Sequence, residues 1–118
     1  MHPAHETGGL EVYRNLDLGV TGQVIRASSV VLINWHMTNK HATNYRYVKF
    51  YNEPLAPTQA NTPVLTIPLA PGASSNPEFL SGIGKFPDGL SVRATTGIAD
   101  NDTGAPTAND VVVNIGIL

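Results

Sequence analysis

The chain has 118 residues, a formal net charge of -2, 14% charged side chains and no cysteine. This length fits one domain with a single core, and the absence of cysteine excludes disulfides, thiolate metal sites and cysteine nucleophiles. The low charge excludes the basic surface that nucleic-acid binding usually needs, and no apolar run approaches the roughly 18 residues that cross a membrane.

The composition also bears on the surface of the protein. Hydrophobic residues make up 42% of the chain, which contains 11 Gly and 9 Pro. Turn-forming residues are therefore plentiful and solvating charge is scarce, a combination unusual for a free cytosolic enzyme. We expect neighbouring chains to cover part of the surface.

Residues 1–9 are polar, contain glycine and show no periodicity, so they predict a flexible arm in front of one domain over residues 10–118. The arm lacks the apolar region of a secretion signal, and we expect a soluble protein. His2 and His5 raise the question of a metal site, but no third ligand lies nearby. A solvated arm, or one ordered on a partner, is the better interpretation.

Two short strands are predicted over residues 10–13 and 18–26, because neither segment has a helical period. Gly19 and Gly22 in the second segment mark a bulge or a place where another backbone comes close.

Residues 29–52 predict a central hairpin that carries the only tryptophan. Alternation in its first half places four apolar side chains on one face: Val31, Ile33, Trp35 and Met37. A polar run over residues 38–44 ends this strand. In its second half Val48 and Phe50 share one face, and the opposite face holds Tyr47, Lys49 and Tyr51.

The rest of the chain also reads as strands and ordered loops. Three prolines in residues 53–63 predict an irregular crossover, and Pro68 makes residues 64–69 an edge strand or marks the end of one. Residues 78–86 alternate weakly, and their Gly-Ile-Gly-Lys stretch lacks the full signature of a phosphate loop.

Two further strands close the sequence. Residues 90–96 alternate cleanly, with Arg93 pointing outward, and a long polar loop follows. Residues 110–118 end on Leu118 without a charged tail, which favours a strand paired inside a sheet or at a subunit contact. With about eight short strands and no helical period, the sequence predicts an all-β fold, an antiparallel β-sandwich of jelly-roll-like type.

Few side chains suggest a binding site. Asp100 and Asp102 stand in a loop with the spacing of a calcium site, but the later bidentate Glu is missing and Asx-turns explain the pattern without a metal. His36 and His41 are interpreted as surface histidines. No supporting motif indicates a catalytic triad.

Aromatic and cationic side chains cluster on the outer face of the second half of the predicted hairpin, where Arg46 also lies. Such residues suit protein contacts or stacking on sugars, and ordinary cross-strand pairs on a solvated face are the alternative. The candidates for partner contacts are His2, His5, Tyr45, Tyr47, Lys49, Tyr51 and Leu118.

Two stretches resemble small virion proteins of tailed bacteriophages. The first is residues 45–69, which begin Tyr-Arg-Tyr-Val-Lys-Phe-Tyr-Asn-Glu-Pro, and the second is residues 94–114, which contain Ala-Asp-Asn-Asp-Thr-Gly-Ala-Pro-Thr. The resemblance covers most of residues 18–118. It implies a decoration or cement protein that is made in the host cytoplasm, binds the major capsid protein on the capsid surface of the virion, and often forms a homotrimer. It carries over no catalytic residue and no cofactor.

Two other functions stay open from the sequence. A carbohydrate-binding or host-surface-binding module displayed on the particle could use the tyrosine face, with calcium at Asp100 and Asp102. A small hydrolase on a sandwich scaffold would need a polar cluster that the sequence does not show.

Overall fold

The computed structural model describes residues 10–77 and 82–118. The predicted arm, with His2 and His5, therefore lies outside the described residues, as does part of the weakly alternating segment 78–86.

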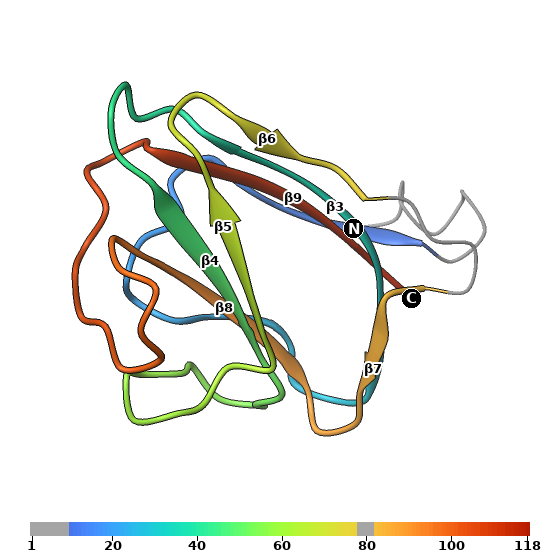
Figure 1. Cartoon of the computed structure of the whole chain (residues 1–118). Coiled ribbons are helices and arrows are strands. Elements are labelled where there is room, and N and C mark those ends of the chain that lie inside the picture. The colour runs from blue at the N-terminus through green and yellow to red at the C-terminus, as the bar shows by residue number, and fades with distance from the viewer. Residues whose placement is uncertain (1–9, 78–81) are drawn as a thin grey trace.

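Nine antiparallel strands form two sheets in the described part of the chain (Figure 1). The strands are β1 (Glu11–Asn15), β2 (Gln23–Arg26), β3 (Val30–Asn39), β4 (Arg46–Tyr51), β5 (Leu65–Leu69), β6 (Ser74–Ser75), β7 (Gly84–Phe86), β8 (Leu90–Thr95) and β9 (Val111–Ile117). The first sheet has the order β1-β9-β3-β6, with β7 also paired to β3, and the second has the order β2-β8-β4-β5. Residues 10–77 and 82–118 contain no helix, so the predicted all-β antiparallel sandwich is confirmed.

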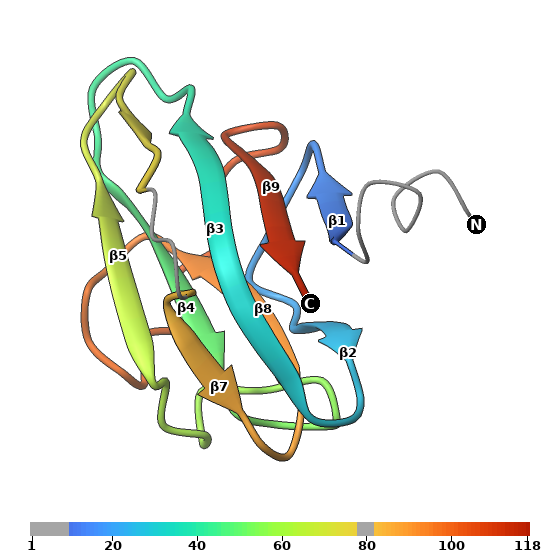
Figure 2. The same cartoon turned by 90° about the vertical axis from the view of Figure 1, so that its right-hand side faces the viewer.

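The connections cross repeatedly from one sheet to the other. The chain changes sheet from β1 to β2, from β2 to β3 and from β3 to β4, and only β4 and β5 are consecutive neighbours within one sheet. The two short strands β6 and β7 pair with different parts of β3 (Figure 2). This crossing order favours jelly-roll connectivity, which stays a prediction.

Apolar side chains from both sheets fill the space between them. The first sheet contributes Leu32, Trp35, Met37, Val111, Val113, Ile115 and Ile117, and the second contributes Val48, Phe50, Leu69, Leu90, Val92 and Ala94. The rings of Trp35 and Phe50 stack across the core with centroids 5.3 Å apart. Along β8, Leu90, Val92 and Ala94 face the core and Arg93 points to the opposite face, as its alternation predicts.

The predicted central hairpin is wrong. β3 belongs to the first sheet and β4 to the second, and the loop between them crosses the edge of the sandwich. The buried side chain of Asn39 holds this crossing, because its Nδ2 donates hydrogen bonds to the carbonyl oxygens of Asn44 and Leu69 at 2.9 and 3.0 Å. The two apolar faces meet across the core instead of lying side by side.

A β-bulge in β3 also changes which side chains point inward. The register with β9 shifts between Leu32 and Asn34, so Leu32 faces the core before the shift and Trp35 after it. Val31 and Ile33, predicted to lie in the core, are only partly buried. A bulge inserts one residue and reverses the alternation beyond it.

The predictions for the edge and central strands are confirmed. β5, which contains Pro68, pairs with β4 alone and lies at the edge of the second sheet. β9 pairs with both β1 and β3, so the hydrophobic end of the chain lies inside the first sheet. Across residues 10–77 and 82–118, no helix is long and apolar enough to cross a membrane.

We expect Gly22→Ala to lower the free energy of unfolding by about 1–3 kcal/mol, because its methyl group would overlap backbone. A Cβ at Gly22 would lie 2.3 Å from the carbonyl oxygen of Pro57 in the crossover. Gly19→Ala is the matched control, since a Cβ there meets nothing within 4 Å. Chemical denaturation of both variants tests this. Equal stabilities would show that the backbone of the crossover moves aside for the methyl group without loss of free energy.

Candidate functional site

A cationic and aromatic cluster of Lys49, Tyr51 and Arg93 lies on the outer face of the second sheet. The sequence placed these side chains on the outer face correctly, but it predicted an exposed surface. Lys49 and Tyr51 are 0% exposed and Arg93 is 1% exposed. Lys49 and Tyr51 are therefore not free contact residues, because the loops on this side of the sheet cover them.

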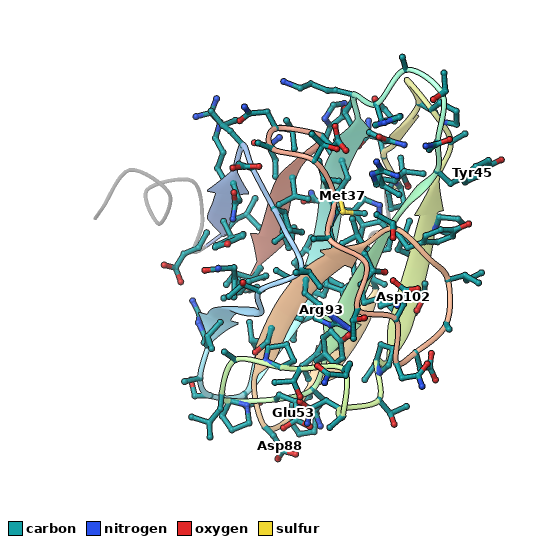
Figure 3. The ribbon with its side chains drawn as sticks, turned by 90° about the vertical axis from the view of Figure 1, so that its left-hand side faces the viewer. Met37, Tyr45, Glu53, Asp88, Arg93 and Asp102 are labelled. Atoms are coloured by element: carbon teal, nitrogen blue, oxygen red, sulfur yellow. The ribbon has the colours of Figure 1, made fainter. Side chains whose placement is uncertain are left out.

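Arg93 joins the sheet to these loops (Figure 3). Its Nε donates a hydrogen bond to the hydroxyl of Tyr51 at 2.8 Å, and its Nη2 donates to the carbonyl oxygen of Asp102 at 2.7 Å. Its Nη1 reaches the carbonyl oxygen of Val20 at 3.5 Å. One guanidinium thus connects β4 and β8 to two segments that are far apart in the sequence.

Lys49 anchors the loop that follows β8. Its Nζ donates hydrogen bonds to the carbonyl oxygens of Gly97 and Ala99. Inside this loop, Oδ1 of Asp102 accepts hydrogen bonds from the amides of Gly97 and Gly104, at 3.3 and 2.7 Å. The Asp102 carboxylate therefore organises the loop as an Asx-type acceptor.

Burial and neighbouring charges shift the pKa values of two side chains in this cluster. Burial lowers the pKa of Lys49 below its ordinary value of 10.5, and the neighbouring Arg93 charge lowers it further, while Asp102 and Asp100 oppose this change. Burial raises the pKa of Tyr51 above 10.0, and the hydrogen bond and charge of Arg93 counteract part of that rise. Two cations and one phenol thus share a site with little water.

We expect wild type to gain stability relative to Lys49→Met as the pH rises towards 10.5, the ordinary pKa of lysine. Between the lowered pKa of folded Lys49 and this value, the unfolded chain binds more protons than the folded chain, so the free energy of unfolding increases with pH. Tyr51 acts in the opposite direction above pH 10.0, but it is present in both proteins. Denaturation of both at about pH 8 and about pH 10 measures the difference, and a constant difference would mean that Lys49 titrates like a surface lysine.

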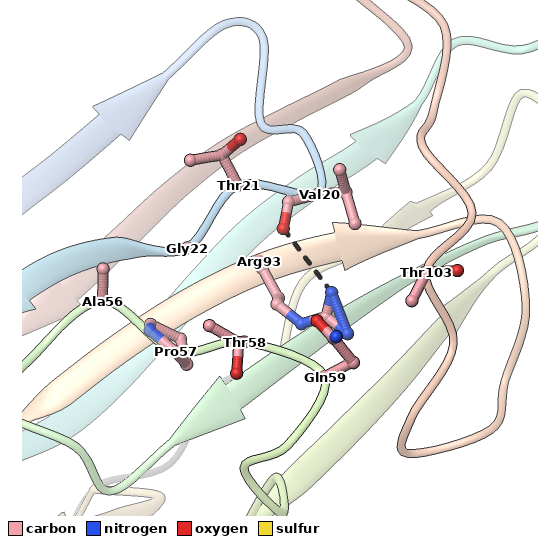
Figure 4. Close-up of a pocket in the computed structure, with 9 residues that line it drawn as sticks. All are labelled: Val20, Thr21, Gly22, Ala56, Pro57, Thr58, Gln59, Arg93 and Thr103. Atoms are coloured by element: carbon pink, nitrogen blue, oxygen red, sulfur yellow. Dashed lines mark hydrogen bonds between the residues drawn. The ribbon is translucent and has the colours of Figure 1, made fainter.

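A hollow of about 320 Å³ opens beside Arg93 (Figure 4). Its walls come from the β1–β2 connection, the proline-rich crossover and the loop after β8. The lining residues are Val20, Thr21, Gly22, Ala56, Pro57, Thr58, Gln59, Arg93 and Thr103. The prolines predicted an ordered crossover, but nothing in the sequence indicated that it would form a wall around Arg93.

Tyr45 and Tyr47 form a smaller aromatic feature at one end of β4. Tyr45 is 49% exposed and points away from the domain in Figure 3. Its ring stacks on Tyr47, with centroids 6.1 Å apart. Leu118 is also exposed, at the end of β9. The structure therefore divides the predicted tyrosine face into the exposed Tyr45, the partly buried Tyr47 and the buried Tyr51.

The other candidates occupy ordinary positions. His36 is exposed, and Nδ1 of His41 accepts hydrogen bonds from the amides of Thr43 and Asn44 in the β3–β4 loop. Asp100 is exposed. Among the described residues, no group of three or more His, Cys, Asp or Glu side chains is placed to hold a metal ion.

Sequence reasoning missed one buried ion pair. Nε of Arg46 lies 3.0 Å from Oδ2 of Asp110, and Arg46 was predicted to lie on the exposed face. The two residues are 64 positions apart. Nothing in the sequence around either residue indicated that this arginine and this carboxylate would meet.

No protein-family model, no curated protein and no solved structure matches this chain. The similarity to phage virion proteins and the role it implies therefore stay predictions.

Proposed function

We propose that this protein is a non-enzymatic structural component of a tailed-phage virion, a decoration or cement protein that binds the major capsid protein as a homo-oligomer, most simply a trimer. The resemblance of residues 45–69 and 94–114 to such proteins supports this role. The β-sandwich is compatible with it but does not decide it, since one fold serves many functions.

The observation that carries the proposal is a surface with few cations and several large exposed apolar side chains. Of the seven Lys and Arg residues in the chain, Lys49, Arg46 and Arg93 are buried, which leaves four for the surface. Large apolar side chains are exposed at the same time, between 38% and 76%: Val12, Leu16, Val24, Leu55, Val64, Ile98 and Leu118. Such a surface suits a protein that is covered by other chains in a permanent assembly.

The proposal is tested by adding purified protein to empty heads of its phage and measuring the bound stoichiometry, with light scattering of the free protein at micromolar concentration. We expect an oligomer and a fixed number of copies per head. The double variant Leu55→Asp/Ile98→Asp changes two exposed side chains and should reduce occupancy at least about tenfold while keeping the β-sheet circular dichroism spectrum. Lys40→Asp, at another exposed position, is the control for added negative charge. A monomer that does not bind heads contradicts the proposal.

A carbohydrate-binding module is the second candidate, and the stacked pair of Tyr45 and Tyr47 favours it. The exposed ring of Tyr45 offers a flat apolar face with a polar edge, which suits a sugar ring. A titration against a glycan panel tests this role. Saturable binding that is lost in Tyr45→Ala would support it, and an absence of binding would leave the structural role as the better proposal.

A further inference from the structure

Two arginines of this protein are buried, and only one of them has a carboxylate as its counter-ion among the described residues. Arg46 is 5% exposed and has the Asp110 carboxylate at 3.0 Å. Arg93 is 1% exposed, and no carboxylate of the described residues forms an ion pair with it. A buried charge is costly unless an opposite charge or a full set of hydrogen bonds compensates it.

The hydrogen bonds of Arg93 leave part of its guanidinium unused. The group has five N–H donors. The described residues supply three neutral acceptors, the Tyr51 hydroxyl and the carbonyl oxygens of Val20 and Asp102, and the Val20 contact is long at 3.5 Å. One N–H on each terminal nitrogen therefore has no acceptor among these residues, and Arg93 lines the hollow.

The neighbouring strand adds to the positive charge. Lys49 of β4 lies directly opposite Arg93 of β8 in the sheet register. Like charges in this position destabilise a sheet. The charges of Asp102 and Asp100 in the loop after β8 act on Lys49. Among the described residues, neither carboxylate forms an ion pair with Arg93. An external anion beside Arg93 would relieve the repulsion between the two cations.

The walls of the hollow select the kind of anion. Apolar surface comes from Val20, Ala56 and Pro57, and hydrogen-bonding groups come from the lining threonines and Gln59. A volume of about 320 Å³ is at the lower end of the range for small-molecule sites. A planar carboxylate matches the paired N–H groups of an arginine, and the apolar walls suit the carbon chain attached to it.

We propose that the hollow beside Arg93 binds a single carboxylate carried on a short apolar chain, either a small organic acid or an acidic side chain of a partner protein. This site is separate from the exposed apolar surface on which the structural role rests. It gives the buried guanidinium a counter-ion that the described chain does not provide.

The experiment is a calorimetric titration of the intact wild-type protein at low ionic strength, where charge interactions are least screened. Acetate and butyrate probe the free acid, and a blocked peptide with one central glutamate probes the side chain of a partner. We expect one saturable site for at least one of these probes, with a matching rise in melting temperature. Binding of the acids alone assigns the site to a metabolite, and binding of the peptide alone assigns it to a partner. Inorganic phosphate should bind at least about tenfold more weakly than the best carboxylate.

Three variants decide whether Arg93 carries the binding. Arg93→Lys keeps the charge but loses the planar fork, and we expect at least about tenfold weaker binding. Gln59→Glu keeps the size of an exposed side chain and adds a negative charge to the wall, so it should weaken binding by a similar factor without disturbing the fold. Arg14→Met removes an exposed arginine of the first sheet and should bind as wild type does.

Two results would overturn the proposal. One is the absence of saturable binding for every carboxylate probe. The other is unchanged affinity in Gln59→Glu, which would place any bound carboxylate outside the hollow even if Arg93→Lys fails to fold.

Discussion

Trp35→Ala should lower the free energy of unfolding by about 3–5 kcal/mol, the largest effect that we expect from a single core substitution. The side chain is 6% exposed and stacks on Phe50 across the interface between the two sheets. Its removal leaves a cavity. It also removes the hydrogen bond that the indole Nε1 donates to Oγ of Ser75 at 2.9 Å. Chemical denaturation monitored by circular dichroism measures the loss.

Trp35→Phe is the control that separates packing from the hydrogen bond. It keeps an aromatic ring against Phe50 and removes the indole N–H, so we expect a smaller loss of about 1–2 kcal/mol. A loss below about 1 kcal/mol in Trp35→Ala would contradict the position of this ring in the core.

The sequence predicted the strands more reliably than their partners. Alternation identifies which face of a strand is apolar, but an apolar face can meet another across the core as well as beside it in a sheet. Trp35 and Phe50 satisfy both arrangements, and the loop over residues 40–45 is long enough for either. The buried hydrogen bonds of Asn39 stabilise the crossing to the other sheet. One of them joins Asn39 to a carbonyl oxygen 30 residues away in the sequence.

The bulge in β3 could not be predicted for a related reason. Residues 30–33 are all apolar, so both alternation patterns are compatible with a core face. The bulge brings Asn34 against the opposite strand: a Cβ on Gly116 would lie 2.3 Å from Oδ1 of Asn34. This close approach involves two residues that are distant in the sequence.

The candidate site was only half predictable for the same physical reason. Alternation placed Lys49, Tyr51 and Arg93 correctly on the outer face of the second sheet. Their burial depends on the paths of the proline-rich crossover and the loop after β8, which short-range patterns do not encode. The sequence indicated Asp102 as a possible metal ligand. In the structure its side chain instead accepts a hydrogen bond from an amide of its own loop, and its carbonyl oxygen accepts one from Arg93.

Asp110→Ala should destabilise the protein by about 3–5 kcal/mol, because it leaves the charge of Arg46 buried without its counter-ion. Among the described residues, the guanidinium would keep only the hydrogen bond that its Nη1 donates to the carbonyl oxygen of Tyr45 at 2.9 Å. The substitution also removes the acceptor for the amide of Thr107, which lies 3.0 Å from Oδ2 of Asp110 and closes the turn before β9. The free energy of unfolding from urea denaturation measures this loss.

Two controls identify the buried charge as the cause. Glu11→Ala breaks the more exposed ion pair with Arg26 and should cost no more than about 1 kcal/mol, with an effect that declines in high salt. Arg46→Met combined with Asp110→Ala removes both charges, so the double variant should be more stable than Asp110→Ala alone. If the double variant is instead less stable by the full sum of the two single losses, the pair is not coupled, and the destabilisation comes from the lost turn beside Thr107.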